Sequence, residues 1–82
     1  MINKELTFPI FRKYTGINVW YKILNDRHFI EIKQLGAKFI VHEVEALQYP
    51  EIIHIQDMIA CREERWEEIP ASIFDDVDGK VV

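Results

Sequence analysis

The sequence predicts an α+β fold. We expect a small antiparallel β-meander of about four to five strands, packed on one face by a single amphipathic helix and followed by a short C-terminal helical turn. Three observations support this prediction. Residues 17–24 alternate between apolar and other side chains with a period of two, as a half-buried strand does. Turn-forming residues occur near positions 15, 25 and 36, a spacing typical of meandering sheets. Residues 50–64 carry an apolar stripe of helical period.

The first two strands are expected at 8–14 and 17–24. Pro9 has no amide hydrogen for a ladder, so the first strand should lie at a sheet edge or begin just after this residue. In the second strand, Val19 and Tyr21 share the face that we expect to be buried, and Trp20 lies on the opposite face.

Residues 27–35 fit two interpretations. As a helix, the segment would be capped by Asn25 or Asp26 and would stop at Gly36. Its apolar residues would then spread too widely around the helix to form one stripe. A strand places Ile30 and Ile32 on one side, and we favour the strand.

The remaining elements follow in order. A fourth strand is expected at 37–47, with Ile40 and Val44 on the face under the helix. Pro50 and the following glutamate are typical of a helix start, so the helix is placed at 50–64. Its stripe consists of Ile52, Ile55, Met58 and Ile59. A short strand at 65–69 and one or two helical turns at 70–77 complete the chain.

The length of 82 residues corresponds to one domain, 1–82, in which 1–7 and 79–82 are expected to be frayed ends. A hydrophobic content of 49% and a charged content of 29% are typical of globular proteins. The lone Cys61 excludes an internal disulfide and a four-cysteine zinc site. No apolar run approaches about 18 residues, so we expect no membrane span. With no apolar signal segment at the start, a cytoplasmic location is expected.

The net charge of −4 is unevenly distributed. Residues 1–62 are close to neutral, and the acidic excess lies in residues 63–82. An acidic chain neutralises few phosphates, so nucleic acid is an unlikely partner.

The side chains around Trp20 are the candidate binding surface. An aromatic residue flanked by cations can stack nucleic-acid bases, and the same residue types dominate protein interfaces. A third interpretation is that the helix, or the 65–77 segment, covers this face and makes Trp20 part of the core. The candidate residues are Phe11, Arg12, Lys13, Tyr14, Trp20 and Lys22.

The expected helix also carries His54, Asp57 and Cys61 on neighbouring turns. These residue types bind divalent metals, and a cysteine near a histidine can act as a nucleophile. Residues 54 and 61 are about 10 Å apart along a helix axis, so they cannot touch. We therefore interpret the three residues as structural, predict no metal and no cofactor, and keep this trio as a weak alternative.

We predict a small cytoplasmic protein-interaction module rather than an enzyme, because no catalytic residue pattern is evident. Its partner would be another protein or a second copy of the chain, paired through sheet edges or open faces. The alternatives are a single-stranded nucleic-acid-binding module that uses the aromatic and basic sheet face, and a metal-binding or enzymatic site on the 50–64 helix.

Overall fold

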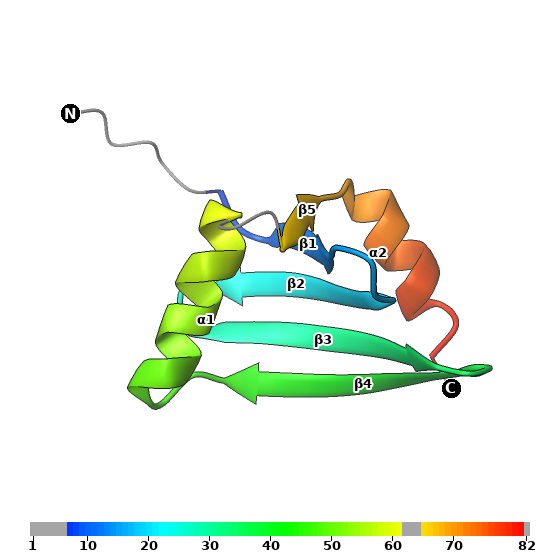
Figure 1. The fold of residues 1–82 in the computed structure, drawn as a ribbon, viewed down its shortest axis with the longest axis horizontal. Coiled ribbons are helices and arrows are strands. Elements are labelled where there is room, and N and C mark those ends of the chain that lie inside the picture. The colour runs from blue at the N-terminus through cyan, green and yellow to red at the C-terminus, as the bar shows by residue number, and fades with distance from the viewer. Residues whose placement is uncertain (1–6, 62–64, 82) are drawn as a thin grey trace.

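A computed structural model of the chain describes residues 7–61 and 65–81 and confirms the α+β class (Figure 1). Segment 27–35 forms a strand, as favoured, and not a helix. The elements are β1 (Ile10–Tyr14), β2 (Val19–Asn25), β3 (His28–Leu35), β4 (Lys38–Glu45), α1 (Tyr49–Ala60), β5 (Trp66–Glu68) and α2 (Ala71–Asp78).

The five strands form one sheet in the order β4-β3-β2-β1-β5. Each pairing is antiparallel, and β1 to β4 form the predicted meander. The short β5 returns to pair with β1, so β1 lies inside the sheet. Strand β1 begins at Ile10, directly after Pro9, which agrees with one of the two placements expected for this proline.

Helix α1 packs on one face of the sheet. Its buried residues Ile55 and Met58 contact a cluster that includes Tyr21, Ile23 and Phe29, and Ile52 and Ile59 pack beside it, as the apolar stripe predicts. The expectation for Ile40 is wrong, because its side chain is 46% exposed. Ile40 pairs with Lys33 near the β3–β4 hairpin, whereas α1 crosses the sheet at the opposite end of β4 (Figure 1).

Helix α2 covers part of the opposite face. Phe74 and Val77 pack on Trp20 and Ile32 in a second buried cluster. Because neighbouring strand residues point to opposite faces, Trp20 and Tyr21 belong to different clusters. The sheet is therefore the middle layer between two helices.

The bounds of α1 differ from the predicted 50–64. At its start, the Glu51 carboxylate accepts hydrogen bonds from the Leu47 and Gln48 amides, at 3.1 and 3.3 Å. The helix ends at Ala60, because Cys61 adopts a left-handed conformation with φ 53°. A left-handed residue is a common way to terminate a helix. Residues 62–64 of the prediction lie outside the described residues.

The expected frayed ends are described only in part, since residues 1–6 and 82 lie outside the described ranges. The Lys80 amide donates to the Val77 carbonyl at 2.9 Å, and Val81 packs against the second cluster. Within 7–61 and 65–81, no helix combines the length and the apolar character needed to cross a bilayer.

Candidate functional site

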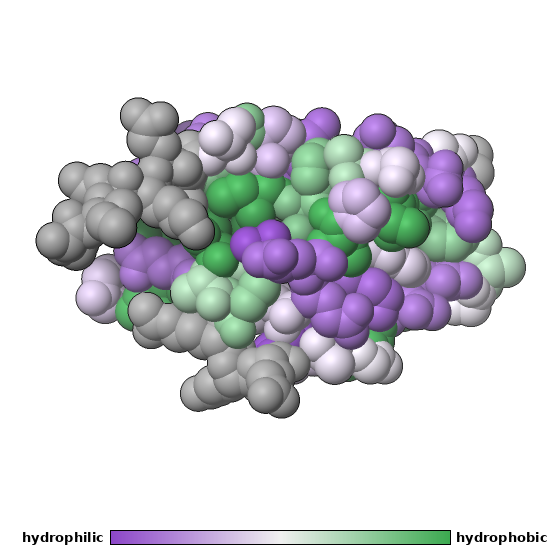
Figure 2. Space-filling model, turned by 90° about the horizontal axis from the view of Figure 1, so that it is seen from above, coloured by the Kyte–Doolittle hydropathy of each residue, from purple (hydrophilic) through white to green (hydrophobic). Residues whose placement is uncertain are grey.

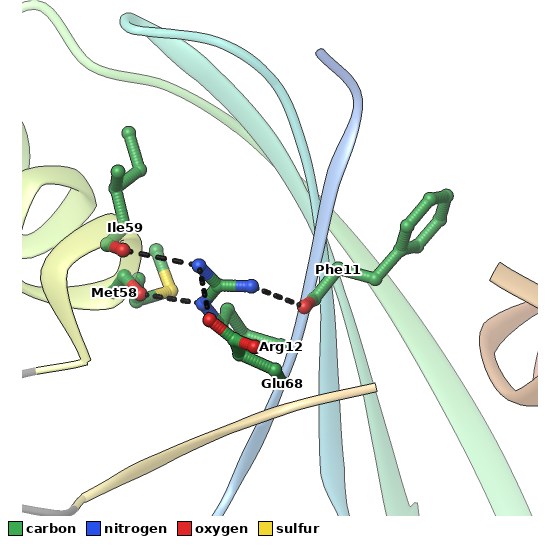
Figure 3. Close-up of polar contacts among 5 residues, drawn as sticks. All are labelled: Phe11, Arg12, Met58, Ile59 and Glu68. Carbon is green, nitrogen blue, oxygen red and sulfur yellow. Dashed lines mark hydrogen bonds and ion pairs between the residues drawn. The ribbon is translucent and has the colours of Figure 1, made fainter. Parts of the chain in front are cut away.

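The six candidate binding residues do not form one open surface. Phe11 and Arg12 are neighbours on β1, and their side chains point to opposite sides of the sheet (Figure 3). Phe11 packs against the second cluster, and its ring lies 5.7 Å from that of Phe74. Arg12 and Tyr14 lie on the face that α1 covers. The sequence pattern therefore placed the residues on the correct strands and predicted that a helix covers one face, but it left open what covers the face of Trp20.

Trp20 is part of the core. Its side chain is 8% exposed and lies among Ile32, Phe74 and Val77. This arrangement is the third interpretation of the sequence, in which the 65–77 segment covers Trp20. The indole can stack on a base or contact a partner only if α2 is displaced.

Arg12 binds the carboxyl end of α1 (Figure 3). Its Nε donates to the Met58 carbonyl at 2.8 Å, and its Nη2 donates to the Ile59 carbonyl at 3.0 Å. Its side chain is 11% exposed, and the Glu68 carboxylate lies 3.9 Å away. The last carbonyls of a helix lack intrahelical partners and carry partial negative charge. Arg12 therefore has a structural role in joining β1 to α1.

Two further candidates, Lys13 and Tyr14, also make contacts within the chain. Lys13 Nζ donates to the carbonyls of Tyr14 and Ile17, at 3.3 and 3.1 Å. The Tyr14 ring packs edge-on against Trp66 at 4.9 Å. Lys22 is half-buried on the α2 side of β2. A contact of these residues with a partner stays a prediction.

Two residues of the trio on the helix, His54 and Cys61, lie beside the first cluster. The His54 ring packs among Tyr21, Phe29 and Trp66, with centroid distances of 6.1, 5.7 and 5.5 Å. Cys61 is a half-buried free thiol beside the first cluster. Within residues 7–61 and 65–81, no three His, Cys, Asp or Glu residues are placed to hold a metal ion.

The aromatic cluster around His54 contains a perturbed phenol. The Tyr21 hydroxyl donates to Glu31 Oε2 at 2.9 Å. Burial, and then the neighbouring Glu31 carboxylate, raise the pKa of Tyr21 above its ordinary value. The Trp66 Nε1 beside it is buried without a hydrogen-bond acceptor in the described part of the chain. Tyr21 is therefore held as a neutral hydrogen-bond donor, which is a stabilising role.

The outer edge of β4 is the remaining candidate site. On its inner side, β4 pairs with β3 without a register shift over its whole length, from Lys38 to Glu45. On its outer side, no described strand pairs with it. Strand β4 has 8 residues and contains no proline. An edge of this length and regularity is a template for another strand, because its outward amides and carbonyls lack strand partners.

Backbone hydrogen bonds show which residues of β4 face outward. The Ala46 amide donates to the Arg27 carbonyl at 2.6 Å, and on the other side of β3 the Gln34 amide donates to the Asn18 carbonyl at 3.0 Å. In an antiparallel ladder, successive residues bond alternately to the two neighbouring strands. In β4 the even-numbered residues therefore bond to β3. The backbone groups that face outward belong to Phe39, Val41, Glu43 and Glu45.

The opposite edge of the sheet is less available. Strand β5 has 3 residues, and both Glu67 and Glu68 are exposed. Seen from the β5 side, hydrophilic side chains lie across the middle of the molecule, between hydrophobic groups (Figure 2). Short strands and exposed charges are the usual protection of a sheet edge. The two edges therefore differ, and β4 is the one suited to pairing.

Exposed apolar side chains accompany the β4 edge. Val41 is 43% exposed, and Leu47, which follows the strand, is 77% exposed. At the beginning of the strand, Lys80 lies over the Phe39 ring, with its Nζ 5.8 Å from the centroid. A shallow hollow of about 290 Å³ lies there, lined by Ala37, Lys38, Phe39, Ile40 and Lys80.

Sequence reasoning indicated that so small a sheet has two edges that can pair with other strands. It did not identify β4 as the strand at one of these edges. The available signal was the consecutive apolar run at 39–41, since one residue of each neighbouring pair must point away from the helix-covered face. Comparisons with protein-family models, curated proteins and solved structures found no match for this chain.

Proposed function

We propose that this protein is an interaction module that accepts a strand from a protein partner at the outer edge of β4. The observation that carries the proposal is the regular 8-residue edge strand, whose outward backbone groups belong to alternate residues from Phe39 to Glu45. Strand addition uses such groups for affinity and the alternating side chains for specificity.

The side chains along the edge support this use. Val41 and Ile40 are both partly exposed and point to opposite faces of the sheet, so an added strand would contact one apolar side chain on each face. The exposed Leu47 extends this apolar surface beyond the end of β4. Burial of such side chains would add to the hydrogen bonds of the new ladder.

The aromatic and basic face is less suited to nucleic acid than its sequence indicates. Trp20 is buried, and Arg12 donates its hydrogen bonds within the chain. Base stacking requires an accessible aromatic face. We also propose a cytoplasmic location, which the free thiol of Cys61 supports because such thiols persist in reducing compartments.

The experiment places a photo-crosslinking amino acid at the exposed position 45 in cells that express the full chain. We expect a discrete protein adduct, identified by mass spectrometry. Val41→Pro removes an outward amide and leaves the β3–β4 ladder intact, so it should abolish the adduct. The matched control Val41→Thr keeps the amide and should retain the adduct.

A crosslinker at Ser72, which is exposed on α2, serves as the positional control. It should give no adduct that depends on residue 41. The proposal is overturned if position 45 yields no adduct, or if Val41→Pro leaves the adduct unchanged while circular dichroism shows a folded chain.

A further inference from the structure

We infer that the strand accepted by β4 is the β4 strand of a second copy of this chain, paired antiparallel around a two-fold axis. This inference rests on the proposed function and names its partner. The two five-stranded sheets would join into one continuous sheet through their open edges.

The charges along the edge favour this occupant. At the beginning of β4, Lys38 and Lys80 surround the hollow beside Phe39. At the end of β4, Glu45 is exposed, and the exposed carboxylate of Glu43 lies 2.6 Å from His28 Nε2 of its own chain. Antiparallel self-pairing sets the basic end of each copy against the acidic end of the other, and does so twice. Such complementarity selects a partner and its orientation.

One register of the two-fold pair engages every outward backbone group of β4. In a two-fold antiparallel pair, residues opposite each other point to the same face. When every outward-facing residue is engaged, Phe39 pairs with Glu45 of the second copy, and Val41 pairs with Glu43 of the second copy. His42 then lies opposite His42 of the second copy, on the axis.

This register also places the flanking side chains in contact range. Glu45 of each copy lies beside Phe39 of the other, over which Lys80 is positioned. Leu47, which is 77% exposed, follows the end of β4. Antiparallel pairing therefore brings Leu47 of each copy to the β3–β4 hairpin of the other, where its side chain loses exposure to water.

The first test is the oligomeric state of the purified full chain, measured by analytical ultracentrifugation from micromolar to millimolar concentration. We expect a monomer–dimer equilibrium. Val41→Pro should raise the dimer dissociation constant at least about tenfold, because each copy loses one hydrogen bond of the shared ladder. Val41→Thr should change it less than about threefold, since its backbone is unaltered.

The second test distinguishes self-pairing from any other partner. Lys80→Glu and Glu45→Lys each place like charges together at both contacts, so each variant alone should dimerise roughly tenfold more weakly. An equimolar mixture restores opposite charges at both contacts of a mixed dimer. We expect the mixture to recover most of the wild-type affinity, with the mixed species resolved by native mass spectrometry.

The inference is overturned if the wild-type chain stays monomeric at millimolar concentration, or if the mixture associates no better than either variant alone. If the chain is monomeric and Val41→Pro still abolishes the adduct at position 45 in cells, the edge binds another protein, and the proposed function stands without the second copy. If both the dimer and the adduct are absent, the proposed function fails as well.

Discussion

The Nε of Arg12, on β1, donates a hydrogen bond to the carbonyl oxygen of Met58, in the last turn of α1, at 2.8 Å. Helix α1 has no basic residue in its own last turn. A strand residue therefore supplies a cation to the carboxyl end of the helix, and this contact joins α1 to the sheet.

Replacement of Arg12 should destabilise the fold. Arg12→Met removes two hydrogen bonds to helix carbonyls together with the charge, and we expect a cost of about 2–3 kcal/mol in the free energy of unfolding. Arg12→Lys keeps the positive charge but lacks the planar guanidinium that reaches both carbonyls, and it should cost less than Arg12→Met. Urea denaturation measures both. Lys33→Met, at an exposed position, is the control and should change stability by less than about 0.5 kcal/mol. Equal effects of Arg12→Met and Lys33→Met would contradict the structural role.

The packing of α2 over Trp20 leads to a second prediction. Phe74→Ala removes the larger of the two buried α2 side chains in the Trp20 cluster and should cost about 3–4 kcal/mol. In a Trp66→Phe background, the fluorescence of Trp20 should shift to longer wavelength under native conditions, because water reaches the indole. Phe74→Leu fills more of the space and should shift the emission less. The exposed Ile73→Ala is the control and should leave the emission unchanged; an unshifted spectrum in Phe74→Ala would mean that α2 does not cover Trp20.

The sequence predicted the strands because the burial of one face imposes alternation on each of them. Alternation also placed Trp20 opposite Tyr21, but it carries no information about what covers the second face. That covering depends on Phe74 and Val77, which reach the sheet from a helix of only 8 residues. So short a segment gives a weak periodic signal on its own.

The prediction for Ile40 failed for a related reason. Alternation correctly placed Ile40 on the same face as Val44, which packs against the first cluster. A 12-residue helix is about 18 Å long and crosses the strands at one end, so its cover does not extend to the hairpin. The outward residues of β4 could not be identified either, because this requires the hydrogen-bonding register of β3 with both of its neighbours.

The Tyr21 phenol predicts a specific loss of stability in alkaline solution. Burial and the Glu31 carboxylate raise the pKa of the phenol in the folded state. The unfolded chain therefore loses the phenol proton at a lower pH than the folded chain does, starting at about pH 10. The contribution of Tyr21 to the free energy of unfolding is complete below that pH. It decreases as the pH rises toward and through the folded-state pKa. The urea midpoint of the wild-type chain should fall with rising pH, and the midpoint of Tyr21→Phe should fall less steeply. Tyr21→Phe should also cost about 1 kcal/mol at neutral pH through the lost bond to Glu31. Parallel pH profiles of the two proteins would refute the assignment.

The hairpin that leads into β4 depends on the backbone of Gly36. This glycine has φ +61°, and a Cβ placed there would meet no atom within 4 Å. Gly36→Ala should therefore cost about 1–2 kcal/mol through backbone strain alone. Gly36→Asn should cost less, since asparagine tolerates this region. Gly79→Ala is the matched control, because Gly79 has φ −66° and ordinary contacts. Thermal unfolding should show no loss for Gly79→Ala, and an equal loss at both glycines would show that φ is not the cause.

The register of self-pairing can be tested with one engineered thiol. In the pairing that engages every outward residue of β4, position 42 meets its equivalent in a non-hydrogen-bonded pair, where Cα atoms are about 4.5 Å apart. This distance suits a disulfide. We expect His42→Cys, in a Cys61→Ser background, to form a covalent dimer under mild oxidation, as non-reducing electrophoresis would show. Lys33→Cys is exposed on the same face but lies on the inner strand β3, so it should remain monomeric. Equal crosslinking at positions 42 and 33 would indicate random collision. Faster crosslinking of Val41→Cys than of His42→Cys would indicate a register in which the two-fold axis lies at Val41.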